Sequence, residues 1–126
     1  MEKRILIIDD EQKNIFALNA VLKSRKYSCI TAASALEGIS ILRAEPDIGI
    51  VLMDMMMPDM DGYEAIRIIR ADKTICSVPV IAVTAQAMKG DREKCLEAGA
   101  NGYISKPVDV DALLELITQA HQKGGR

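Results

Sequence analysis

Polar and charged side chains follow four short runs of apolar, β-branched residues in this chain. Each is an aspartate, a threonine or a lysine, types that bind metal ions or phosphate oxygens. They are Asp9 and Asp10 after residues 4–8, Asp54 after 50–53, Thr84 after 80–83 and Lys106 after 103–105. If the runs are buried parallel strands, their carboxyl ends share one edge of a sheet and bring these side chains together. The sequence therefore predicts a functional site at that edge.

Three carboxylates at one edge of a sheet repel one another and resist ionising together unless a divalent cation offsets their charge. A site with only oxygen ligands suits Mg²⁺, which takes few carboxylates and fills its other positions with water or phosphate oxygens. Lys106 could merely neutralise the acidic cluster, but a lysine and a threonine hydroxyl are also what the oxygens of a phosphoryl group require. Because an aspartate carboxylate can itself be a nucleophile, this edge predicts phosphoryl transfer to an aspartate.

Strand-like runs alternate with helix-length amphipathic runs along the chain. That alternation is typical of βαβ units, so the predicted fold class is α/β with a doubly wound parallel sheet. We expect strands at residues 4–8, 28–32, 49–53, 79–83 and 102–105, and helices at 12–25, 34–44, 62–72, 87–98 and 109–122. Ser34 and Asp109 can cap helices at their N-termini, and Gly99 can end one.

The helix expected at 12–25 has one apolar face by its spacing. Residues at i, i+3, i+4, i+7 and i+8 form the predicted buried stripe: Asn14, Ala17, Leu18, Val21 and Leu22. Phe16 then lies almost opposite that stripe. An exposed aromatic side chain beside a charged site is a candidate docking residue, although scattered apolar residues on a surface are common and need no function.

Size, charge and cysteine content restrict the function classes. A chain of 126 residues with 49% hydrophobic content fits a single domain over 1–126, with a core at 4–122 and a short frayed tail. The net charge is −2 and the charges are interspersed, which predicts no direct nucleic-acid binding. Residues 1–4 lead straight into an expected strand without a long apolar region before a cleavage site, and no apolar run has the length of a membrane span. Cys29, Cys76 and Cys95 lack CxxC spacing, which favours a reducing compartment without structural zinc. We therefore expect a cytoplasmic protein.

Two further patterns near Asp54 look like binding motifs and have simpler explanations. The methionines at 53, 55, 56, 57 and 60 look like a soft metal site, but alternate residues of a strand point to opposite faces, which favours core filling and loop packing. Residues 59–62 look like part of a calcium loop. With Gly62 as the sixth position, the first and twelfth would be Met57 and Ile68, which excludes that geometry. His121, the only histidine, is far from the motifs in sequence and is a poor candidate phosphodonor.

Four segments together resemble the receiver domain of two-component response regulators, in particular the chemotaxis regulators. They are residues 7–11, 51–62, 82–85 and 102–107, with Asp9-Asp10, Asp54, Thr84 and Lys106 in the expected places. Each motif alone is weak, but the four at this spacing are highly specific, and the resemblance covers residues 4–120. It implies a flavodoxin-like (βα)5 fold, with five parallel strands in the order 2-1-3-4-5.

The resemblance also implies a role for the acidic residues. Asp54 would accept a phosphoryl group from a phosphohistidine on a histidine kinase or a histidine phosphotransfer protein. Asp9 and Asp10 look like the pair that holds Mg²⁺, with Asp54 and the backbone carbonyl of Met56 as the remaining protein ligands.

Lys106, Thr84 and Tyr103 complete the implied set. Lys106 looks like the lysine that pairs with the phosphoryl oxygens, and the family commonly places a cis peptide before Pro107. Thr84 and Tyr103 match the family's switch pair, in which the hydroxyl turns toward the new phosphoryl group and the ring moves inward behind it. The surface that this movement reshapes would lie at 87–122, where a downstream target or a second copy of the chain would dock.

Rival functions fit the sequence less well. A phosphatase that forms an aspartyl phosphate would want a second carboxylate two residues after the nucleophile, where this chain has Met56. We therefore expect no turnover of an external substrate. A nucleotide-binding domain would want a glycine-rich turn after the first strand, which is acidic here. The alternative that stays open is a degenerate receiver that binds proteins without being phosphorylated. A stand-alone regulator and a receiver excised from a hybrid sensor kinase both fit.

Overall fold

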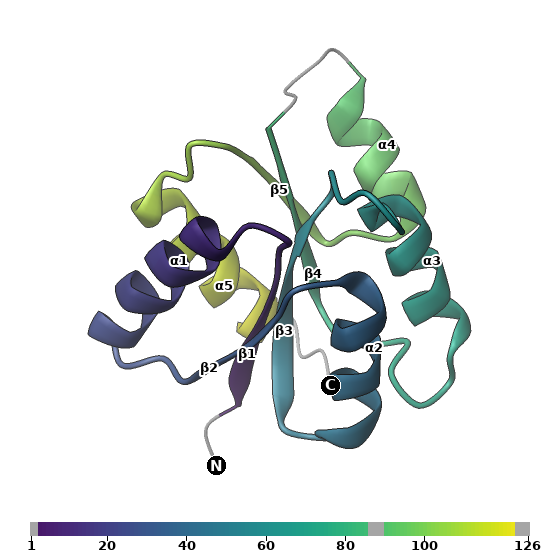
Figure 1. Cartoon of the computed structure of the whole chain (residues 1–126), viewed down its shortest axis with the longest axis horizontal. Coiled ribbons are helices and arrows are strands. Elements are labelled where there is room, and N and C mark those ends of the chain that lie inside the picture. The colour runs from purple at the N-terminus through teal and green to yellow at the C-terminus, as the bar shows by residue number, and fades with distance from the viewer. Residues whose placement is uncertain (1–2, 86–89, 123–126) are drawn as a thin grey trace.

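Five strands and five helices alternate along residues 3–85 and 90–122, which are those described by this computed structural model (Figure 1). The strands are β1 (Arg4–Ile8), β2 (Cys29–Ala32), β3 (Ile48–Asp54), β4 (Val80–Thr84) and β5 (Gly102–Ser105). The helices are α1 (Gln12–Ser24), α2 (Ala35–Ala44), α3 (Gly62–Ala71), α4 (Asp91–Ala98) and α5 (Val110–Gln122). The predicted bounds agree closely. The first residues of the helix expected at 87–98 lie outside the described residues, and so does the side chain of His121.

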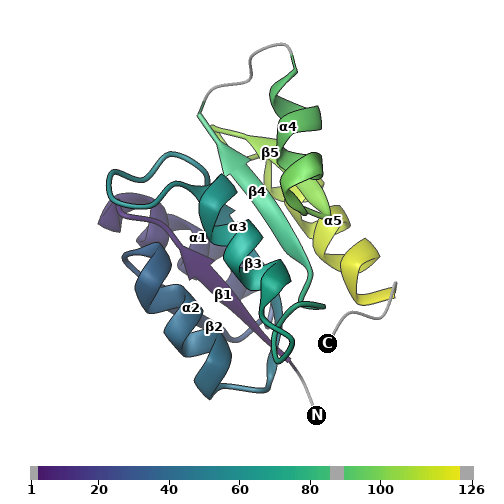
Figure 2. The ribbon, with the colours of Figure 1, turned by 90° about the vertical axis from the view of Figure 1, so that its right-hand side faces the viewer.

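All neighbouring strands pair in parallel, in the order β2-β1-β3-β4-β5. This confirms the predicted flavodoxin-like fold and strand order. Helices α1 and α5 cover one face of the sheet, and α2, α3 and α4 cover the other (Figures 1 and 2). A helix connects each strand to the next, as parallel pairing requires. The carboxyl ends of all five strands therefore point toward one edge of the sheet.

The central strand β3 is buried along its whole length, which explains why its sequence is continuously apolar before Asp54. Ile50 and Leu52 pack in the core under α1 and α5, whereas Val51 and Met53 pack in the core under α2, α3 and α4. Successive side chains of a strand point to opposite faces, so one strand supplies both cores. Asp54 ends this strand and is only 3% exposed.

Side-chain caps fix where three of the helices begin. The Ser34 hydroxyl caps α2 and the Asp109 carboxylate caps α5, as predicted, each accepting a backbone N–H three residues later at 3.2 Å. The Asp61 carboxylate does the same for α3 at 2.9 Å. Helix α4 ends at Ala98, and the following residue, Gly99, has a φ of 120°, which lies in the region that favours glycine.

The predicted buried stripe on α1 is partly wrong. Ile15 and Leu22 are the buried residues of this helix, whereas Ala17 is exposed. The other predicted members are half-buried: Asn14, Leu18 and Val21. Turning Ile15 toward the sheet removes more apolar surface from water than turning Ala17 would. Phe16 is 78% exposed, as the spacing predicts.

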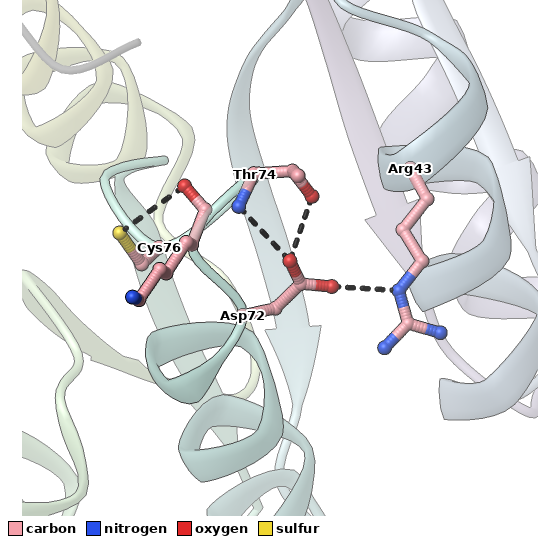
Figure 3. Close-up of polar contacts among 5 residues, drawn as sticks. Arg43, Asp72, Thr74 and Cys76 are labelled. Carbon is pink, nitrogen blue, oxygen red and sulfur yellow. Dashed lines mark hydrogen bonds and ion pairs between the residues drawn. The ribbon is translucent and has the colours of Figure 1, made fainter.

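Asp72 links α2 to the loop that follows α3 (Figure 3). Its carboxylate accepts hydrogen bonds from the Arg43 guanidinium at 2.8 Å, the Thr74 N–H at 2.9 Å and the Thr74 hydroxyl at 2.7 Å. The Thr74 hydroxyl is the largest of the contributions that lower the pKa of Asp72 to about 2. Cys76, in the same loop, is exposed, and its thiol donates to the Lys73 carbonyl at 3.8 Å.

Candidate functional site

The carboxyl ends of β1, β3, β4 and β5 lie side by side at the top of the sheet in Figure 1. The register pairs that align them are Ile8 with Met53, Asp54 with Val83 and Thr84 with Ser105. Asp9 and Asp10 follow β1, Asp54 and Thr84 end their strands, and Lys106 follows β5. Residues up to 97 positions apart in the chain are therefore placed around one edge.

The three acidic residues form a compact group. Asp9, Asp10 and Asp54 each offer a carboxylate oxygen, and these atoms all lie within 4.8 Å of one another. Asp9 and Asp54 are 2% and 3% exposed, whereas Asp10 is exposed. The Glu11 N–H donates to Asp9 Oδ1 at 2.9 Å, which fixes that carboxylate in the turn after β1.

Lys106 reaches into the acidic group from the end of β5. Its Nζ lies 3.4 Å from Asp9 Oδ2 and 3.7 Å from Asp54 Oδ1. The Lys106 N–H donates to the Thr84 carbonyl at 2.7 Å, so the backbone of this residue extends the pairing of β4 with β5. The peptide between Lys106 and Pro107 is cis, as the resemblance implies.

The protein stabilises the ionised form of the Asp54 carboxylate less well than water does. Burial raises the pKa of Asp54 to about 6, and the neighbouring Asp9 acts in the same direction. The Met56 N–H, which donates to Asp54 Oδ1 at 3.0 Å, and the Lys106 ammonium oppose that shift without cancelling it. Burial disfavours a charge that lacks enough partners, so the site as it stands favours added positive charge.

The donor set fits Mg²⁺. The three carboxylates supply oxygen ligands alone, two of them are buried, and one ammonium faces them. Hard divalent cations prefer such ligands. That the backbone carbonyl of Met56 is a further ligand of Mg²⁺ stays a prediction.

The loop after β3 is held close to the site by a glycine. The Gly62 N–H donates to the Met55 carbonyl at 3.3 Å, and a Cβ on Gly62 would lie 2.8 Å from the Met55 Cα, so a larger residue would displace the loop. Met53, Met55 and Met57 are buried in the core, which confirms the core-filling interpretation for these three. Met56 is 47% exposed at the rim of the site.

The two residues of the expected switch occupy neighbouring strands. Thr84 ends β4 and is 1% exposed, and Tyr103 lies on β5, paired with Ala82. The Tyr103 ring is half-buried against the core under α2, α3 and α4. Its hydroxyl donates to Asp91 Oδ2 at 3.1 Å.

Asp91 and Tyr63 are members of this neighbourhood that the sequence did not single out. The Tyr63 hydroxyl donates to Asp91 Oδ1, so one carboxylate holds two phenols. Tyr63 is the second residue of α3, and Asp91 begins α4. No motif links the two residues, and their contact follows only from how α3 packs beside α4.

The chain also matches known proteins in sequence. The family model of the response regulator receiver domain matches residues 5–118. The polar-differentiation response regulator DivK of Brucella ovis is 36% identical over 118 residues, which are 93% of this chain and 94% of that protein.

Solved structures show the same fold. A receiver domain of a sensor histidine kinase from Pseudomonas aeruginosa PAO1, with a magnesium ion coordinated in its active site cleft, has a TM-score of 0.85 and 34% identity, covering 94% of this chain and 97% of that one. The chemotaxis protein CheY4 of Vibrio cholerae has a TM-score of 0.87 at 21% identity, covering 95% and 99%, which supports the fold alone.

No helix among residues 3–85 and 90–122 is long and apolar enough to cross a membrane. The family match spans nearly the whole folded core, and the strand order is the one that the resemblance implies. This chain belongs to the family of receiver domains of two-component response regulators.

Proposed function

We propose that the chain accepts a phosphoryl group on Asp54 from a phosphohistidine of a histidine kinase or a histidine phosphotransfer protein. The observation that carries this proposal is the position of Asp54, a buried carboxylate within 4.8 Å of two other carboxylates and 3.7 Å from the Lys106 ammonium. Among the described acidic residues, Asp54 alone combines the last position of a strand with burial.

In the proposed step, an oxygen of the ionised Asp54 carboxylate attacks the phosphorus of the phosphohistidine. An O–P bond forms, the P–N bond breaks, and its electron pair returns to the imidazole nitrogen. The Met56 N–H and the Lys106 ammonium, which both contact Asp54 Oδ1, hold the carboxylate in place. Lys106 can then pair with the phosphoryl oxygens.

Asp9, Asp10 and Asp54 are the residues that would hold Mg²⁺, with the Met56 carbonyl as a further proposed ligand. When bound, the ion supplies positive charge that offsets the carboxylates and the oxygens of the phosphoryl group. The magnesium ion in the receiver domain from Pseudomonas aeruginosa supports this assignment.

Phosphorylation would signal through Thr84 and Tyr103. The phosphoryl group adds about −1.5 to −2 charges, and the buried Thr84 hydroxyl can turn toward its oxygens. Tyr103, on the neighbouring strand, would then move inward and change the surface of α4, β5 and α5. The chain would act as a cytoplasmic phosphorelay component, without turnover of an external substrate, by binding a downstream protein or a second copy of itself through that surface.

Labelling with acetyl phosphate tests the proposal. Intact-protein mass spectrometry in the presence of Mg²⁺ should show one added phosphoryl group on the wild type and none on Asp54→Asn. Asp59→Asn is a matched control, because Asp59 is an exposed carboxylate in the loop just after the site. Equal labelling of Asp54→Asn would refute the acceptor assignment, and an unlabelled wild type would favour a degenerate receiver that acts only as a protein-binding module.

A further inference from the structure

Three side chains from separate elements meet beside the expected switch: Tyr63 at the start of α3, Asp91 at the start of α4 and Tyr103 on β5. The Tyr63 hydroxyl donates to one oxygen of the Asp91 carboxylate, and the Tyr103 hydroxyl donates to the other at 3.1 Å. Helices α3 and α4 contact each other and are neighbours in Figure 1. We call these three residues the tyrosine–aspartate cluster.

The surroundings keep the cluster in its bonded form. The Lys94 ammonium lies 5.1 Å from the centre of the Tyr63 ring, and the Cys95 thiol lies 3.9 Å from the Tyr63 hydroxyl. Burial, followed by the Asp91 carboxylate, raises the pKa of both Tyr63 and Tyr103, so both phenols stay protonated donors. Asp91 lies in the first turn of α4, where the helix dipole favours a negative charge.

We propose that Asp91 is the positioning residue of the switch: its carboxylate, held by Tyr63, keeps the Tyr103 ring half-buried, and the ring must release Asp91 before it can move inward. This proposal rests on the proposed function for its consequence in signalling. The effect of the cluster on the position of the Tyr103 ring in the unphosphorylated chain does not depend on that function.

The bonding makes Asp91 suited to this role. A hydrogen bond to an ionised acceptor is roughly twice as strong as a neutral one, and Tyr63 occupies the second oxygen, which limits how the carboxylate can follow a moving ring. Because Asp91 begins α4, a ring that leaves it removes one of the two phenol bonds at the N-terminal turn of that helix. The cluster would thus connect the state of the phosphorylation site to the surface proposed for partner binding.

If Asp91 holds the Tyr103 ring in place, removing Asp91 should raise the affinity for any ligand that needs the ring to move inward. A ligand that needs the inward ring binds with an apparent dissociation constant equal to the intrinsic one divided by the fraction of chains in the competent state. Beryllofluoride with Mg²⁺ is the probe, as a mimic of the phosphoryl group. Asp91→Ala should tighten its binding about tenfold, which corresponds to about 1.4 kcal/mol. Tyr63→Phe should tighten it about threefold, because Asp91 remains but is less firmly held.

The position of the ring can be read directly by NMR. The chain has three tyrosines, at 27, 63 and 103, so selective ring labelling gives few signals to assign. In the unliganded protein, the Tyr103 signal of Asp91→Ala should move toward the position that it takes in the beryllofluoride-bound wild type. Tyr27→Phe, which removes a hydroxyl outside the cluster, and Glu97→Gln, which removes an exposed charge from α4, should leave both the signal and the affinity unchanged.

A double-mutant cycle separates this role from simple damage to the fold. Asp91→Ala combined with Tyr103→Phe should bind beryllofluoride no more tightly than either single variant, because both remove the same bond. Weaker or unchanged binding in Asp91→Ala and Tyr63→Phe, with an unmoved Tyr103 signal, would overturn the proposal. A wild type that binds no beryllofluoride would instead refute the proposed function, while the ring signal of the unliganded variants would still decide on the cluster.

Discussion

At the scale of single residues, the burial of Asp54 opposes the negative charge that its carboxylate needs for reaction. Asp54 must be ionised to act as a nucleophile, yet it ends a fully buried strand beside Asp9. The ionised form is therefore less stable in the folded chain than in water, and Lys106 and the Met56 N–H offset only part of the difference. A residue placed for reactivity in this way lowers the stability of the fold that carries it.

The cost of burying this charge predicts how the effect of Asp54→Asn on the free energy of unfolding depends on pH in the absence of Mg²⁺. The folded-state pKa of Asp54 is raised from 3.8 to about 6, so its contribution favours folding below about pH 4 and is lost as the pH rises through 6. The asparagine variant should therefore be more stable than the wild type at pH 8, by on the order of 1 kcal/mol after allowance for solvent screening. The two proteins should be nearly equal at pH 4.

Urea unfolding followed by circular dichroism at both pH values would measure this difference. Asp59→Asn, in the exposed loop after the site, should show no comparable dependence. A variant that is less stable than the wild type at pH 8 would show that the hydrogen bonds to Asp54 outweigh the effect of its burial.

At the scale of the elements, the strand ends could be predicted because a parallel sheet leaves little freedom. Once runs such as 50–53 are recognised as buried strands, Asp54 and Thr84 must lie at the same edge, whatever the register in detail. The face of α1 was harder, since Leu22 belongs to both the predicted and the observed face, and a rotation of the helix by about one residue position brings Ile15 inward in place of Ala17. The contact of Asp91 with Tyr63 could not be predicted, because it depends on how α3 and α4 pack.

Asp72 connects α2 to the loop after α3, and its contribution to the free energy of unfolding depends on pH. The Thr74 hydroxyl, Arg43 and the Thr74 N–H lower the folded-state pKa of Asp72 from 3.8 to about 2. A group with a depressed pKa stabilises the fold above its unfolded-state pKa, and that stabilisation is lost as the pH falls through the folded-state value. Asp72→Asn should therefore lower the urea midpoint at pH 5, and the difference from the wild type should shrink as the pH approaches 2.

Thr74→Val provides the companion measurement, because it removes the hydroxyl that makes the largest contribution while it retains the Thr74 N–H. Its effect should be smaller than that of Asp72→Asn and should follow the same pH dependence. A difference that is the same at pH 5 and pH 2 would mean that Asp72 acts through packing rather than through its charge.

At the scale of the whole molecule, the site proposed for phosphorylation and the surface proposed for partner binding lie in different places. The carboxyl edge gathers the acidic group, and the surface of α4, β5 and α5 lies to one side of it (Figures 1 and 2). Thr84 touches both regions, because it ends β4 beside the acidic group and pairs with Ser105 on β5. A change in charge at Asp54 can therefore reach the surface by the movement of a few side chains, with the sheet itself unchanged.

The last prediction tests this route. Beryllofluoride with Mg²⁺ should shift NMR amide signals through β5 and α4, well beyond the residues that touch the acidic group. Thr84→Ala should reduce the distant shifts, because the side chain that carries the change is gone, and should still allow acetyl phosphate to label Asp54. Thr118→Ala is a suitable control, since its hydroxyl bonds to the Leu114 carbonyl within α5. Shifts confined to residues 9–10, 54–56 and 106 in the wild type would show that the charge stays local, and the proposed surface switch would then be wrong.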